Sequence, residues 1–365
     1  MADSRLFQPV TVGAMQLLHR IAMAPMTRLR ASDQHVPLPL MATYYSQRAC
    51  VPGTLLISEA TYISAEAGGY DNVPGIYTNE QSKAWTEITN AVHARGSYIY
   101  CQLWALGRAA REAVAAKEGF AVKAPSDVGL SGGAVPTALT TQEIRQLVQD
   151  FATAAKQAIE AGFDGVEIHG ANGYLVDQFI QSTANQRSDE YGGSIENRSR
   201  FTLEVLKAVT EAIGSDKTAL RLSPFGNALE IRMEDTIPQF SDLIRKANRL
   251  GLAYLHLVNP RASGDGDGIG QSSDSLDFAI ELWDGPLLLA GALDSGSAKK
   301  LVELDYPMRD IVASFGRPFI SNPDLVYKIE NGLDFTPYDR NTFYLRASPQ
   351  GYIDYPLCKE VDALM

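Results

Sequence analysis

Short, continuous apolar runs recur along this chain, and segments with helical spacing separate them. Runs without alternating polar residues are typical of strands that are buried on both faces, as in an all-parallel sheet. Eight such runs occupy residues 21–23, 54–57, 98–103, 165–168, 219–222, 254–258, 286–290 and 311–314. Because strand and helix alternate and each crossover must be right-handed, the pattern predicts an α/β fold, a single (β/α)8 TIM barrel.

The helices between the runs have recognisable starts and stops. Thr140 and Glu143 are spaced as a capping box, and the apolar stripe that follows them ends at Gly162. A second helix is expected to open at Ser194, and a third to include Phe240. These amphipathic helices are expected to cover the outside of the barrel.

Two segments exceed what the barrel itself needs. A barrel of this kind takes ~250 residues, whereas the chain has 365. Residues 104–136, after the third predicted strand, are too long for an ordinary strand-to-helix connection, and we expect them to form a capping insertion at the mouth. Residues 335–365 form a Tyr-rich tail that should pack on the barrel. No linker or repeat divides the chain, so residues 1–365 are expected to form one domain.

Composition excludes several classes of partner. The 32 Lys and Arg against 43 Asp and Glu give a formal net charge of −11, which argues against binding to nucleic acid or an anionic membrane. No apolar run reaches the length of a membrane helix or a signal segment, so a cytoplasmic protein is expected. Cys50, Cys101 and Cys358 are far apart and form no metal-binding cluster, so no metal site is predicted.

Glycine and arginine after the last two predicted strands indicate a phosphate site. In this fold the catalytic face lies at the carboxyl ends of the strands, and the loops after strands seven and eight often bind phosphate. Gly291 follows strand seven, and Gly316 and Arg317 follow strand eight. The alternative is that the glycines serve tight turns and that Arg317 pairs with a surface acid.

Arg221 interrupts the fifth apolar run, where its guanidinium would point into the barrel. A buried charge of this kind needs an anion. Glu167 on the neighbouring strand could supply it as a structural salt bridge, and the alternative is an anionic ring such as a reduced flavin.

His169, Asn172 and Tyr174 follow the fourth predicted strand. An imidazole and an amide can donate two hydrogen bonds to one oxygen, which polarises a carbonyl or nitro group, and a nearby phenol can deliver a proton. Individually, each residue is also compatible with a structural histidine or a packed tyrosine.

Taken together, these segments resemble the Old Yellow Enzyme family of flavin-dependent enoate reductases, and its fungal and yeast-like branch in particular. The most specific segment runs from Gly165 to Leu175 as GVEIHGANGYL, and is followed by Asn185, Arg187 and the run YGGSIENR at 191–198. Further matching segments are APMTR at 24–28, GYDNVPG at 69–75, QLW at 102–104, RLSP at 221–224, FGR at 315–317, SNPDL at 321–325 and GYIDYP at 351–356.

The resemblance implies bound FMN. Thr27 would lie near the flavin O4, Gln102 beside the pyrimidine half and Arg221 near N1. The full set of implied cofactor residues is Pro25, Met26, Thr27, Ala60, Gln102, His169, Arg221, Ala290, Gly291, Gly316, Arg317 and Phe343.

The resemblance also implies a substrate site over the flavin. His169 and Asn172 would bind the substrate oxygen, and Tyr174 would be the proton donor. Tyr70, Trp104 and Tyr344 would shape the substrate pocket.

The implied reaction passes hydride from NADPH, with NADH as the open alternative, through flavin N5 to the β-carbon of an α,β-unsaturated aldehyde, ketone or nitroalkene. The chain departs from the yeast pattern at Ala60, in the insertion and over residues 227–235, and these departures leave the substrate open. The alternatives are a pathway-specific reductase or isomerase of a fungal secondary metabolite, of the alkaloid type, and a flavin-binding protein without turnover. A phosphosugar enzyme would have no use for Gln102 and Arg221. We expect a monomer or a weak homodimer.

Overall fold

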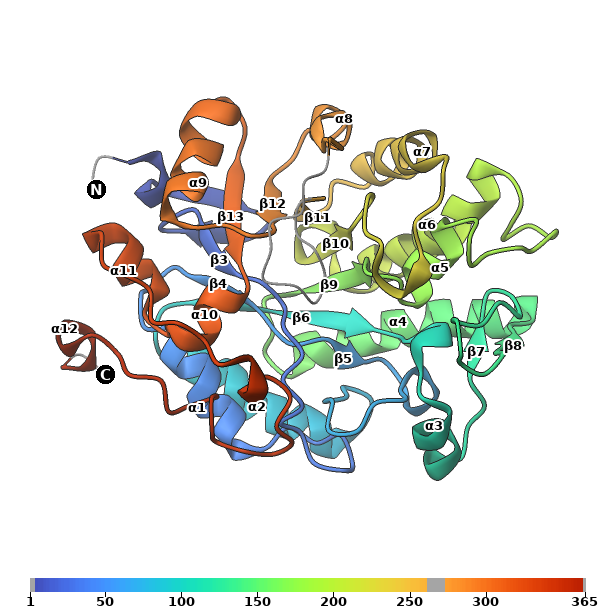
Figure 1. The fold of residues 1–365 in the computed structure, drawn as a ribbon, viewed down its shortest axis with the longest axis horizontal. Helices are drawn as coiled ribbons and strands as arrows, with labels where there is room; N and C mark the ends of the chain where they lie inside the picture. The colour runs from blue at the N-terminus through green and yellow to red at the C-terminus, as the bar shows by residue number, and fades with distance from the viewer. Residues whose placement is uncertain (1–3, 261–272, 364–365) are drawn as a thin grey trace.

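A computed structural model describes residues 4–260 and 273–363 and has a closed parallel barrel at its centre (Figure 1). Each strand pairs with the next along the chain, and the last returns to the first, so the barrel closes. Each of the eight apolar runs supplies one strand, which confirms the predicted fold. The strands are β3 (Ile21–Met23), β4 (Leu55–Ile57), β6 (Tyr98–Trp104), β9 (Gly165–Gly170), β10 (Thr218–Leu222), β11 (Tyr254–Val258), β12 (Leu287–Ala290) and β13 (Ile311–Phe315).

Helices surround the strands on the outside (Figure 1). The predicted capping box is present, because the Thr140 side chain accepts from the backbone of Glu143 and the Glu143 side chain accepts from the backbone of Thr140. Ser194 likewise caps its helix through the backbone N–H of Asn197. The outer helices are α1 (Pro39–Arg48), α2 (Asn79–His93), α4 (Thr141–Glu160), α6 (Ile195–Ile213), α7 (Thr236–Asn248), α8 (Asp277–Glu281), α9 (Ser295–Lys300), α10 (Arg317–Ser321) and α11 (Leu325–Asn331). None of the described helices is long and apolar enough to cross a membrane.

An amino-terminal hairpin closes one end of the barrel. Its strands β1 (Val10–Val12) and β2 (Met15–Leu17) bury their apolar side chains against barrel residues that include Tyr100 and Tyr254. Gly13 turns the hairpin at φ +54°, and a Cβ there would lie 2.2 Å from the Asp216 carbonyl oxygen. The turn therefore requires glycine, and the hairpin blocks the end of the barrel where the strands begin.

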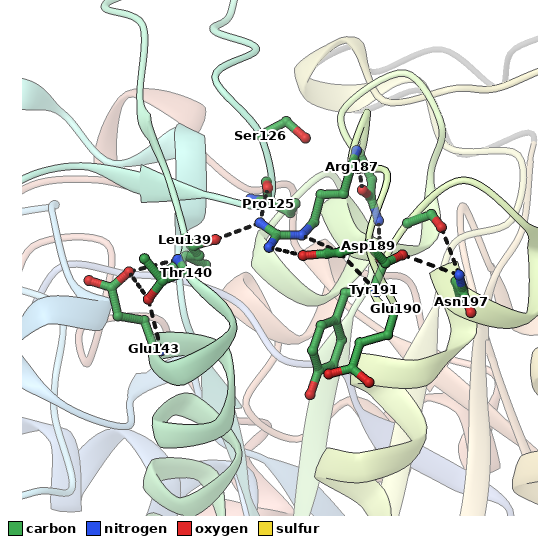
Figure 2. Close-up of polar contacts among 12 residues, drawn as sticks. Pro125, Ser126, Leu139, Thr140, Glu143, Arg187, Asp189, Glu190, Tyr191 and Asn197 are labelled. Carbon is green, nitrogen blue, oxygen red and sulfur yellow. Dashed lines mark hydrogen bonds and ion pairs between the residues drawn. The ribbon is translucent and has the colours of Figure 1, made fainter.

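The insertion after β6 contains a short helix, α3 (Glu112–Glu118), and the strand β7 (Lys123–Ala124), which pairs in parallel with β8 (Thr137–Ala138). Figure 2 shows how Arg187 fastens this segment: its Nη1 donates to the carbonyls of Pro125 at 2.7 Å and Leu139 at 2.5 Å. The same guanidinium forms a two-bond pair with Asp189, at 3.0 and 2.5 Å. Part of the family-like segment after β9 thus has a structural use, which is to hold the insertion.

The carboxyl-terminal tail packs on the barrel as predicted. Tyr352 is fully buried and stacks on Tyr44 of α1, with ring centroids 4.0 Å apart. Two buried arginines from the segment after β3 hold the tail backbone: Arg28 donates to the carbonyl of Gly351 at 2.7 Å, and Arg30 to that of Gln350 at 2.9 Å. The tail is therefore part of the folded domain, and it brings residues 338–344 to the cavity described next.

Candidate functional site

A cavity of about 1100 Å³ lies at the carboxyl ends of the barrel strands. Its volume slightly exceeds the ~300–1,000 Å³ typical of small-molecule sites, so it can hold a cofactor together with a substrate. Every residue assigned to the site from the sequence lines this one cavity: Pro25, Met26, Thr27, Ala60, Tyr70, Gln102, Trp104, His169, Asn172, Tyr174, Arg221, Ala290, Gly291, Gly316, Arg317, Phe343 and Tyr344. The structure thus brings the whole set together, while the individual roles stay predictions.

His169 lies near the end of β9 with only 5% of its side chain exposed. The backbone N–H of Ala171 points at its Nδ1 at 3.4 Å, so Nδ1 acts as the acceptor. Burial holds the pKa of His169 well below its usual range, and the positive charge of Arg221 lowers it further. The imidazole is therefore neutral at physiological pH and carries its proton on Nε2, which makes Nε2–H a hydrogen-bond donor.

Asn172 and Tyr174 stand on the turn that leaves β9. Asn172 has a left-handed backbone, with φ +59°, and its N–H donates to Ser223 Oγ at 2.8 Å. The Tyr174 ring meets the edge of Trp104 at 4.6 Å and of His169 at 5.1 Å between centroids. These contacts place the Tyr174 phenol beside the His169 imidazole, and Asn172 lines the same cavity.

Tyr70 lies next to Tyr174 and lines the same wall. Burial raises the pKa of Tyr70, while a hydrogen bond with Tyr174 acts in the opposite direction. The two phenols therefore interact directly.

The buried carboxyl of Asp177 stabilises the turn that carries Asn172 and Tyr174. Its Oδ2 accepts from the backbone N–H of Gly173 at 2.9 Å, and its Oδ1 accepts from Gln181 Nε2 at 3.0 Å. Burial raises the pKa of Asp177 to about 7, against the lowering effects of Gly173, Gln181 and Arg108. Asp177 therefore titrates within the range of pH in which an enzyme of this kind is assayed.

This raised pKa predicts a pH-dependent stability. The folded protein binds the Asp177 proton more tightly than the unfolded chain does, so this group's contribution to stability declines as the pH rises from about 4 to about 7. Asp177→Asn removes the titration and keeps one acceptor. Between pH 5 and 8 the free energy of unfolding of the variant should rise by ~2–3 kcal/mol relative to wild type. Urea denaturation of variant and wild type at pH 5 and pH 8 measures both free energies of unfolding. If the variant differs from wild type by the same amount at both pH values, Asp177 does not titrate in this way.

The cavity offers polar groups that suit a flavin phosphate ester. Arg221 Nε and Ser314 Oγ are buried and have no hydrogen-bond partner within residues 4–260 and 273–363. Gly291 has φ +126°, a conformation that other residues rarely adopt, and a Cβ on Gly316 would lie 3.7 Å from Met26 Sδ, which leaves its backbone accessible. Unsatisfied buried donors are costly unless a ligand meets them, so these residues fit an anionic cofactor such as FMN.

The alternative of an Arg221–Glu167 salt bridge is not what the structure has. No ion pair joins the two side chains in the described part of the chain. Glu167 instead bonds to Gln102 and to His256. Arg221 thus keeps its guanidinium at the cavity surface, where burial lowers its pKa and the charge of Glu167 opposes that shift only in part.

Sequence reasoning missed several residues at the cavity. Arg111, Tyr338 and Arg340 line it but stand in segments without a recognisable pattern. Asp71 also lines it, and the family-like segment at 69–75 that contains it had suggested a role only for Tyr70. Residues 227–229, which had no clear family match, also line it. Arg108 of the insertion holds this loop by donating to the carbonyls of Leu229 at 2.9 Å and Glu230 at 3.2 Å.

Comparisons with known proteins agree with this geometry. Residues 5–335 match the model of the NADH:flavin oxidoreductase / NADH oxidase family. A chanoclavine-I aldehyde reductase, fgaOx3, from Penicillium roqueforti is 52% identical over 98% of this chain and 97% of its own length. An NADP-dependent oxidoreductase, lnbE, from Aspergillus flavus is also 52% identical, over 97% of this chain and 96% of its own.

The fold comparison gives the same answer. The structure of an Old Yellow Enzyme homologue from Zymomonas mobilis superposes with a TM-score of 0.90 at 39% identity, and the match covers 97% of this chain and 99% of that one. The resemblance seen in the sequence is thereby confirmed, and the family implies FMN as the cofactor. The chain belongs to the NADH:flavin oxidoreductase / NADH oxidase family, is homologous to the Old Yellow Enzymes and is a flavin-dependent oxidoreductase.

Proposed function

We propose that this protein is an FMN-dependent ene-reductase that uses NADPH to reduce the C=C bond of α,β-unsaturated aldehydes, ketones or nitroalkenes. One observation carries the proposal: a single cavity is lined by Arg221, the phosphate-type loops after β12 and β13, and the trio of His169, Asn172 and Tyr174. Side chains suited to holding a cofactor, binding a substrate oxygen and donating a proton therefore line one cavity, which supports transfer between two bound molecules.

Bound FMN would accept hydride from the reduced nicotinamide and deliver it to the β-carbon of the alkene. Gly291, Gly316 and Arg317 would hold the phosphate, and Arg221 would face the ring.

The chain's own part in substrate chemistry lies with the trio. His169 Nε2–H and the Asn172 amide would donate to the carbonyl or nitro oxygen, which withdraws electron density from the C=C bond. Tyr174 would give its hydroxyl proton to the α-carbon, so that one hydride and one proton complete the reduction.

A narrower candidate is a reductase, or an isomerase, dedicated to one secondary metabolite. Both 52%-identical relatives are fungal, and one is named for the reduction of a single aldehyde, chanoclavine-I aldehyde. The loop at 227–229, held by Arg108, lines the cavity where it would select such a substrate. This candidate uses the same residues and differs only in how many alkenes are accepted.

We expect the purified protein to be yellow and to release one FMN per chain on denaturation. Anaerobic NADPH should bleach the flavin absorbance, and an enal, an enone or a nitroalkene should restore it. NADH titrated in parallel measures the coenzyme preference, and a panel of alkenes of graded size separates the general reductase from the dedicated one.

Two results would contradict the proposal. A protein that stays colourless after incubation with FMN would not be an FMN enzyme. A protein that binds FMN but is neither bleached by NADPH nor reoxidised by any of the alkenes would be a flavin-binding protein without turnover.

A further inference from the structure

A carboxylate that the reaction does not use lies in the barrel just below the cavity. Glu167 of β9 is fully buried, and it stands in register with Gln102 of the neighbouring strand β6. Its Oε1 accepts from Gln102 Nε2 at 2.8 Å, and its Oε2 lies 2.8 Å from His256 Nδ1 on β11. Glu167 itself does not line the cavity, but Gln102 does, so Glu167 acts on a ligand there only through other residues or through its charge.

Glu167 is the acidic member of this cluster, and its surroundings favour its ionised form. Burial raises the pKa of Glu167, but His256, Arg221 and Gln102 lower it by more, and the net shift is downward. Burial lowers the pKa of His256 despite the opposing effect of Glu167. The hydrogen bonds from Gln102 and His256, together with the nearby Arg221, favour the ionised form of Glu167, and its charge faces Arg221 without a direct ion pair.

The carboxylate also fixes which way the Gln102 amide points. An ionised carboxylate only accepts hydrogen bonds, so Gln102 must offer it an N–H rather than its oxygen. The amide oxygen and the second N–H of Gln102 remain for the cavity. This pair matches the edge of a flavin pyrimidine, where the N3–H donor stands beside a carbonyl acceptor, and a flipped amide would not match it.

We propose that Glu167 is a positioning residue for FMN that sets both the orientation of the Gln102 amide and, by opposing the charge of Arg221, the reduction potential of the bound flavin. The inference rests on the proposed binding of FMN in this cavity. Reduction adds negative charge to the ring, so Arg221 favours the reduced state and Glu167 disfavours it. Glu167 would keep the flavin a stronger hydride donor than Arg221 alone would allow.

The test compares three variants by the ratio of the dissociation constants of oxidised and reduced FMN, together with the midpoint potential. Glu167→Gln is isosteric and removes the charge, so it should shift the ratio at least tenfold in favour of reduced FMN, which is about 30 mV upward for a two-electron couple. Oxidised FMN should bind more weakly, since a neutral amide in place of the carboxylate lets the Gln102 amide flip. Arg221→Met should shift the ratio in the opposite direction.

Glu167→Asp separates the two effects. It keeps the charge but withdraws the carboxylate from Gln102, so the potential should stay near that of wild type while oxidised FMN binds more weakly. Glu204→Gln is the matched control, because it makes the same chemical change at a half-buried carboxylate on α6 that bonds to Tyr191 instead. Glu204→Gln should change neither the binding of FMN nor its midpoint potential.

Three results would overturn the inference. In the first, the ratio of the dissociation constants of oxidised and reduced FMN for Glu167→Gln stays within threefold of the wild-type ratio. In the second, that ratio shifts in favour of oxidised FMN. The third is a Glu167→Asp shift as large as that of Glu167→Gln, which would show that the charge is not responsible. If Glu167→Gln loses FMN altogether, Glu167→Asp decides the positioning role: weaker binding of oxidised FMN by Glu167→Asp supports it, and wild-type binding contradicts it. Absence of FMN from the wild-type protein would instead refute the proposed function, and the inference with it.

Discussion

Replacing Tyr174 with phenylalanine is expected to slow reduction of an enone by about 10²- to 10⁴-fold, the usual contribution of general acid catalysis. Phenylalanine keeps the ring that packs against Trp104 and His169, so the cavity wall should stay intact. Reduction of the bound FMN by NADPH needs no proton from this hydroxyl, and its rate should stay near that of wild type. The loss should therefore fall on one half-reaction only.

Anaerobic stopped-flow measurement of both half-reactions provides the check. A nitroalkene should suffer less than an enone, because its nitronate product is stable enough to leave and be protonated in solution. Tyr98→Phe serves as the control, since that hydroxyl bonds to the Gln16 carbonyl, outside the cavity. Equal slowing of both half-reactions, or no slowing with the enone, would rule out Tyr174 as the proton donor.

Replacing Arg30 with methionine is expected to lower the free energy of unfolding by ~3 kcal/mol or more, because hydrogen bonds from a charged donor contribute ~1.5–3 kcal/mol each. Arg30 is fully buried, and methionine fills much of its volume without donating. Four of the carbonyls left without this donor belong to the tail, at Thr342, Phe343, Ser348 and Gln350, and the fifth is that of Arg28. Because Phe343 lines the cavity, FMN should also bind more weakly.

Urea denaturation measures the loss of stability, and limited proteolysis should show earlier cleavage within residues 335–363. Arg346→Met is a matched control on the tail itself. Its partner Asp71 lies 2.9 Å away, but the Arg346 side chain is 53% exposed, so that pair should contribute less than ~1 kcal/mol. A loss for Arg30→Met no larger than for Arg346→Met would mean that the tail is held mainly by its apolar side chains.

The barrel could be predicted from the sequence because its determinants are local. A strand buried on both faces must be apolar throughout, and a helix start such as Thr140 with Glu143 is specified within four residues. The β1–β2 hairpin could not be predicted in this way, because its determinants are not local. Its three-residue strands alternate between buried and exposed positions, and only contact with Tyr100 and Tyr254 shows that they belong to the barrel.

The fold alone predicts only the site residues that stand at strand ends, whereas Tyr70, Phe343 and Tyr344 could be assigned only from the family resemblance. His169 and Asn172 follow an apolar run and Arg221 lies within the last two residues of another, so the fold itself places them at the cavity. Arg30 and Gln350 are 320 residues apart in sequence, and no local pattern links them. The sequence offers Glu167 as a candidate partner for Arg221, whereas its hydrogen bonds go to Gln102 and His256, a choice that only side-chain geometry reveals.

The hairpin at Val10–Leu17 has a kinetic consequence for the proposed reaction. It fills the end of the barrel where the strands begin, so the flavin would be reached from the side of Tyr70, Trp104 and Tyr344. Dinucleotide and alkene would then take turns in the same place, each departing before the other arrives. Such an enzyme follows ping-pong kinetics. An excess of either reactant then inhibits, because it occupies the form of the enzyme, oxidised or reduced, that the other reactant must bind.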